Sequence, residues 1–115
     1  MIINTTLNQK HCIPCEGGMP ALDHEYVQKY AKEVPTWTVS PDEKNIKKEF
    51  EFKDFVEAMK FVNSVAEIAN AENHHPDIYI FYNKVRLELS THAVNGLFEN
   101  DFILAAKIDA ITPVK

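Results

Sequence analysis

Three histidines are the residues of this chain whose type and spacing could do chemistry. His74 and His75 are adjacent and precede Pro76, and His92 follows seventeen positions after His75. An imidazole has an unperturbed pKa of about 6.5, so it can both donate and accept a proton near neutral pH. The three histidines therefore predict a proton-transfer site, and no activated nucleophile is evident beside them.

The sequence between these histidines predicts a β-hairpin. Asp77–Tyr82 and Val85–Thr91 are typical of two short strands, joined at Asn83-Lys84. A hairpin brings its two ends together. We therefore expect the histidine pair before the first strand to lie near His92, which follows the second.

The remaining pattern predicts three helices and a second hairpin. The predicted helices run from a cap at Asp23 to about Glu33, from Asp54 to about Asn73, and over Asn100–Ile111. The second hairpin pairs Trp37–Val39 with Ile46–Phe52. The order α-β-β-α-β-β-α predicts an α+β domain, in which three helices pack on one face of a four-stranded antiparallel sheet.

The N-terminal lead-in contains the only two cysteines of the chain. Residues 1–20 are rich in proline and glycine and should be irregular, within a single domain that spans residues 1–115. Cys12 and Cys15 form a lone C-x-x-C pair, whereas a zinc site would need a second pair and a redox site a βαβ unit. We expect structural or incidental cysteines in a loop, with a redox or metal role as the alternative.

The composition limits the classes of partner. The 115 residues carry a net charge of −5 and are 45% hydrophobic, which is typical of a globular domain and unfavourable for binding nucleic acid. No apolar run approaches the roughly 20 residues of a membrane span, and no basic region followed by an apolar one begins the chain. The composition predicts a cytoplasmic protein with neither nucleic acid nor membrane as partner.

The predicted helix 54–73 has an unusually wide apolar face. Its residues at helical spacing are Phe55, Met59, Val62, Ala66 and Ala69, and the face is widened by Phe61, Val65 and Ile68. A surface helix needs an apolar arc of only about 100°. The excess predicts a homodimer or homotetramer formed through this helix, and the alternative is a helix buried deeply within its own domain.

Five segments together resemble one enzyme family. They are Asn73-His74-His75-Pro76-Asp77-Ile78, Tyr82-Asn83-Lys84-Val85, Leu89-Ser90-Thr91-His92, Gly96-Leu97 and the run from Asp101 to Asp109. In order and spacing they resemble pterin-4a-carbinolamine dehydratase. The resemblance extends from the first helix to the C-terminus, and the lead-in at 12–22 is similar to that of bacterial and plant members.

The resemblance implies a reaction. It is the dehydration of 4a-hydroxytetrahydrobiopterin, or a related 4a-hydroxytetrahydropterin, to the quinonoid dihydropterin and water. This step would serve pterin recycling for aromatic amino acid hydroxylases such as phenylalanine hydroxylase, without a metal or organic cofactor. Two rival interpretations remain. Three imidazoles could hold a metal ion, and animal family members also act as dimerisation cofactors of a homeodomain transcription factor through the long helix.

The resemblance also implies roles for individual residues. His74 and His92 would be the acid and base, in either order, and His75 would bind and orient the pterin. Asp101 would hydrogen-bond an imidazole and set its tautomer. The other candidates for binding the substrate or supporting the site are Asn70, Pro76, Asp77, Ile78, Ser90 and Thr91.

Three positions depart from the family pattern. Asn70 stands where the family usually has an acidic or other ionisable residue, which predicts slower turnover. Ile78 replaces a tryptophan of animal members. Phe98 replaces a threonine that caps the last helix in many relatives, so Asn100 or Glu99 is expected to provide that cap.

Overall fold

The computed structural model describes residues 7–14 and 19–112. Its elements are η1 (Leu7–Gln9), α1 (His24–Ala31), β1 (Thr38–Val39), β2 (Ile46–Glu51), α2 (Phe55–Glu72), β3 (Asp77–Phe81), β4 (Lys84–Leu89), η2 (His92–Val94) and α3 (Glu99–Ile111). Apart from the two short 3-10 helices, this is the predicted order. The α+β fold is confirmed.

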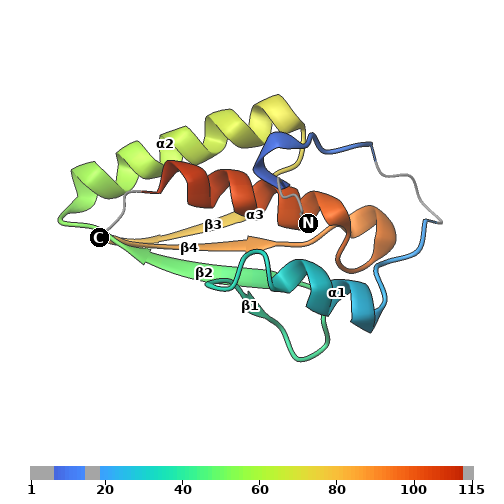
Figure 1. Ribbon diagram of the computed structural model, residues 1–115. Coiled ribbons are helices and arrows are strands. Elements are labelled where there is room, and N and C mark those ends of the chain that lie inside the picture. Colours follow the sequence, from blue (N-terminus) through green and yellow to red (C-terminus); the bar gives the residue numbers. More distant parts are fainter. Residues whose placement is uncertain (1–6, 15–18, 113–115) are drawn as a thin grey trace.

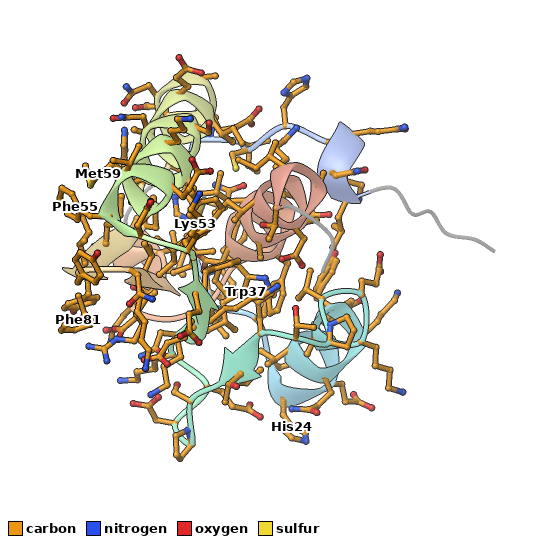
Figure 2. All side chains as sticks on the ribbon, turned by 90° about the vertical axis from the view of Figure 1, so that its left-hand side faces the viewer. His24, Trp37, Lys53, Phe55, Met59 and Phe81 are labelled. Carbon is orange, nitrogen blue, oxygen red and sulfur yellow. The ribbon has the colours of Figure 1, made fainter. Side chains whose placement is uncertain are left out.

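The four strands form one antiparallel sheet in the order β1-β2-β4-β3. Both predicted hairpins are present, and they join through β2 and β4, where Ile46 pairs with Leu89 and Glu51 with Lys84. The helices lie on one face of this sheet, with α2 and α3 side by side along it (Figures 1 and 2). The hairpin of β3 and β4 turns at Tyr82-Asn83, one residue earlier than predicted.

Helix α3 is the central helix of the domain. Its buried side chains include Phe102, Ile103, Leu104, Ala105 and Ile108. A helix that is apolar around its circumference must be covered on several sides, and here η1, α1 and α2 all contact it. Within the described residues, none of the helices is both long and apolar enough to cross a membrane.

Local signals at the ends of α2 fix the start of the hairpin that follows. Asp54 caps the helix by accepting a hydrogen bond from the Glu57 N–H at 2.9 Å. At the other end Asn73 adopts a left-handed conformation with φ 53° and ψ 40°. Asparagine tolerates this region better than most residues, so the chain leaves the helix directly at His74.

The expectation of a broad exposed apolar face on the helix 54–73 is wrong. Phe61 and Val65, which widen the apolar stripe in sequence, are 6% and 0% exposed. The Phe61 ring packs against Phe50 of β2 and against Phe52, with centroids 4.6 and 5.0 Å apart. The wide stripe is accounted for by the sheet and α3 of the same domain, so it provides no argument for oligomerisation or for a partner protein.

Exposed apolar side chains of α2 occur instead in its first turn. Phe55 is 46% exposed and Val56 61% exposed. The Phe55 ring stacks on Tyr82 of the hairpin turn, and Figure 2 shows Phe55 and Phe81 at the same edge of the molecule. The exposed apolar surface therefore belongs to the β3 edge and not to the length of the helix.

Replacement of Phe61 tests the assignment of this side chain to the core. Phe61→Ala should lower the free energy of unfolding by about 3–5 kcal/mol, because it removes a buried ring and leaves a cavity. Phe55→Ala, the matched control at a half-exposed ring, should cost less than half as much. Urea denaturation of both variants measures the difference. An unchanged stability for Phe61→Ala, together with a lower mass in solution, would restore the interface interpretation.

Candidate active site

One cavity collects residues from four separate parts of the chain. It has a volume of about 410 Å³, within the range of small-molecule sites. Its lining residues are Ile13, Pro14, Asn73, His74, His75, Ser90, Thr91, His92, Ala93 and Asn100. The lining therefore comes from the lead-in, the turn between α2 and β3, the segment after β4 and the start of α3.

His74 is held by a buried carboxylate. Its Nε2 lies 2.6 Å from Oδ1 of Asp101, whose side chain is fully buried, while 12% of the His74 side chain is exposed. A carboxylate only accepts hydrogen bonds, so Nε2 of His74 carries the proton in this pair. The contact thereby fixes the orientation of the ring and the tautomer of its neutral form.

The same carboxylate caps the N-terminus of the last helix. Asp101 Oδ2 accepts hydrogen bonds from Thr91 Oγ1 at 2.8 Å and from the Phe98 N–H at 3.0 Å. Asp101 therefore caps α3 from its third position, as the acidic residue of a capping box does. The expectation that Asn100 or Glu99 would replace the missing threonine cap is wrong, because the cap comes from Asp101.

The other two histidines are more accessible. His75 is exposed, and its Nε2 lies 3.0 Å from Oδ1 of Asn70, one turn back on α2. His92 is exposed at the start of η2, and Asn95, the residue after this short helix, adopts a left-handed conformation. Asn70 thus contacts His75 and not His74, so its uncharged amide orients a ring at the cavity edge.

The remaining predicted residues divide into two groups. Ser90 and Thr91 line the cavity with the histidines. Pro76, Asp77 and Ile78 do not line it: Asp77 is exposed at the first position of β3, and the half-buried Ile78 packs against the hydrophobic core.

Sequence reasoning missed the lead-in as a part of this cavity. Ile13 and Pro14 line it, and the Asn100 side chain holds Ile13 by accepting from its N–H at 3.0 Å and donating to its carbonyl at 2.7 Å. Asn73, Ala93 and Asn100 were missed as lining residues too. The similarity of the lead-in to bacterial and plant members was the one signal that this segment matters.

Cys12 lies beside this contact in an environment that suppresses ionisation. Burial raises the pKa of its thiol to about 12, and the negative charges of Glu72 and Asp101 add to the effect. The Cys12 Sγ lies 3.6 Å from the Asn100 carbonyl. Cys15, the second residue of the C-x-x-C pair, lies outside the described residues.

Glu72 anchors the same segment from the last turn of α2. Its carboxylate accepts hydrogen bonds from the Cys12 N–H at 2.7 Å and from His11 Nδ1 at 2.9 Å, and Lys107 Nζ lies 3.6 Å away. Burial opposes ionisation of this carboxyl, but these contacts outweigh it and lower its pKa. Among residues 7–14 and 19–112, no group of three or more His, Cys, Asp or Glu side chains is placed to hold a metal ion.

Comparisons with known proteins give a consistent result. A family model described as pterin 4 alpha carbinolamine dehydratase matches residues 20–111. A protein of Legionella pneumophila (strain Corby) is 48% identical over 110 residues, which cover 95% of this chain and 97% of that protein. One of Halorhodospira halophila is 43% identical over 106 residues, covering 92% and 97%. Both are named "putative pterin-4-alpha-carbinolamine dehydratase".

A solved structure has the same fold. The crystal structure of a transcriptional coactivator/pterin dehydratase from Brucella melitensis superposes with a TM-score of 0.75 at 32% sequence identity. The superposition covers 79% of this chain and 97% of the Brucella melitensis chain. The family model starts at residue 20, so the cavity residues Ile13 and Pro14 precede the segment that it matches.

The hydroxyl of Thr91 should be needed for the stability of the site. Thr91→Val keeps the side-chain shape but removes a donor to a buried carboxylate, which should cost about 1.5–3 kcal/mol of unfolding free energy. Thr38→Val, at an exposed position of β1, is the control and should change stability by at most about 0.5 kcal/mol. Guanidinium denaturation at pH 7 measures both. Equal stabilities of the two variants would contradict the Thr91–Asp101 pairing.

Cys12 should be a poor nucleophile in the folded protein. Thiolate is the reactive species, and raising the pKa from 9.0 to about 12 lowers the thiolate fraction at pH 8 by about 1000-fold. In a Cys15→Ser variant, iodoacetamide should therefore modify Cys12 at least about 100-fold more slowly in the folded chain than in urea. Mass spectrometry over time gives both rates, and similar rates would show an accessible, ionisable thiol.

Proposed function

Because the chain belongs to the pterin-4α-carbinolamine dehydratase family of hydro-lyases, we propose that it dehydrates a 4a-hydroxytetrahydropterin by histidine acid/base catalysis. The C4a–O bond breaks, the hydroxyl takes up a proton and leaves as water, and N5 loses its proton. A C4a–N5 double bond forms, which gives the quinonoid dihydropterin. The reaction is redox-neutral and needs only one proton donor and one proton acceptor.

The observation that carries this proposal is the convergence of His74, His75 and His92 on one cavity. An imidazolium and a neutral imidazole can divide the two proton transfers, each of which typically contributes about 10²–10⁴-fold to the rate. We assign this division to His74 and His92, and the binding and orientation of the pterin to His75.

The contact with Asp101 supports an active part for His74. With Nε2 donating to the carboxylate, Nδ1 is the ring nitrogen left to exchange a proton with the substrate. Asp101 is then a positioning residue, since it acts through His74. Ser90 and Thr91 line the same cavity and are candidates for substrate contacts.

The place of this reaction in metabolism follows from its chemistry. A 4a-hydroxytetrahydropterin arises when a pterin-dependent hydroxylase transfers one oxygen atom, and the quinonoid product must be reduced before it can be reused. We propose that the protein links these two steps, as the family resemblance implies for aromatic amino acid hydroxylases such as phenylalanine hydroxylase. When this protein is added to such a hydroxylase, the sustained turnover of the hydroxylase should rise.

Substitution of the cavity histidines tests the mechanism. His74→Ala and His92→Ala should each lower kcat by about 10²–10⁴-fold, because each removes one proton transfer. The assay follows formation of quinonoid dihydropterin from the 4a-carbinolamine by absorbance and subtracts the reaction without protein. His24→Ala is the control, since that exposed side chain pairs with Glu43 on the surface and does not line the cavity.

The outcomes separate the possible roles. Full activity of His92→Ala with an intact fold would eliminate the assignment of this residue to proton transfer. A raised KM with unchanged kcat in either variant would indicate a binding role only. Loss of activity in His24→Ala would show that the assay reports stability and not the cavity.

A further inference from the structure

The segment from Lys10 to Pro14, which we call the strap, contacts two helices that are distant from it in sequence. Lys10 Nζ lies 2.7 Å from a carboxylate oxygen of Glu99 at the start of α3. Further along the strap, Glu72 on α2 and Asn100 on α3 hold its main chain. In Figure 1 this N-terminal segment lies beside the end of α2 and over α3.

The hydrogen bonds of the strap fix its backbone at the cavity. Asn100 is 3% exposed and uses both ends of its amide on the main chain of Ile13. The Glu72 carboxylate, whose side chain is 7% exposed, accepts a hydrogen bond from the N–H of Cys12, the residue immediately before Ile13. Buried polar groups with matched partners define one geometry, because any displacement would leave them unsatisfied.

The side chain of Ile13 contrasts with its fixed backbone. Ile13 as a whole residue is 53% exposed although it lines the cavity. Pro14 beside it is also exposed at the cavity. An apolar side chain that is held at a cavity wall but left open to solvent gains free energy when a flat ring covers it.

From these contacts we infer that the strap is a substrate-binding wall, in which Ile13 and Pro14 contact a face of the pterin ring. Glu72 and the amide of Asn100 are positioning residues that hold this wall. The inference rests on the proposed function for the identity of the ring. It assigns specificity to a segment that precedes the part of the chain matched by the family model, residues 20–111.

Truncation of Ile13 tests the wall directly. Ile13→Ala should raise KM for the 4a-carbinolamine by about 3–10-fold with kcat within twofold, because apolar contact is lost and the histidines are untouched. Ile111→Ala is the matched control: this isoleucine is 40% exposed at the end of α3 and does not line the cavity. The kcat and KM of this control should stay within twofold of the values for the unaltered protein.

Glu72→Gln tests the anchoring of the wall. Glu72 does not line the cavity and holds the strap through the Cys12 N–H, so its replacement should release the strap without removing a group that faces the substrate. We expect KM to rise at least about threefold, and trypsin to cleave after Lys10 about tenfold faster than in the unaltered protein. Glu67→Gln, an exposed position on the same helix, should change neither. In the double variant with Ile13→Ala, the rise in KM should match that of Ile13→Ala alone.

A second measurement separates this inference from the proposed reaction. Calorimetric titration with 7,8-dihydrobiopterin, which cannot be dehydrated at C4a, should give a dissociation constant about 3–10-fold higher for Ile13→Ala than for the unaltered protein. Equal affinities would overturn the wall even if the enzyme is active. If the protein is inactive but shows this difference in affinity, the binding wall stands and the proposed reaction is wrong. If the unaltered protein does not bind 7,8-dihydrobiopterin, both proposals are wrong.

Discussion

The buried carboxylate of Asp101 is the group on which the rest of the site depends. A buried charge is costly unless its oxygens are paired, and here Thr91, Phe98 and His74 supply the donors. These donors come from the end of the second hairpin, the start of α3 and the turn after α2. One carboxylate thus joins three elements and sets the direction of an imidazole, so the geometry of the site is inseparable from the packing of the domain.

Much of this arrangement could be predicted from local sequence patterns. The alternation in β4, where Val85, Leu87 and Leu89 are fully buried, defines a strand with one face in the core. The hairpin is a short-range structure, so the positions of His74 and His92 at its two ends follow from the turn between the strands. The caps at Asp23 and Asp54 are equally local, and both form as predicted.

The remaining features depend on contacts between distant segments, which periodicity does not encode. Nothing in the pattern of β2 indicates that it pairs with β4, and this pairing creates the sheet that covers Phe61 of α2. The apolar width of α2 was therefore misinterpreted as a partner surface. The strap shows the same limit: Asn100 and Ile13 are 87 positions apart, and neither residue type indicates the other.

The two kinds of wall in the cavity differ in how they are held, and this difference has a chemical consequence. The His74 ring is held by its hydrogen bond to the buried Asp101 carboxylate, whereas His75 and His92 remain accessible. The strap is fixed through its main chain, which leaves the Ile13 side chain exposed. On the proposed assignment, such a site presents imidazoles for proton transfer and an apolar surface for ring contact, and the adjacent residues Asn100 and Asp101 tie the two together, because one holds the strap and the other holds His74.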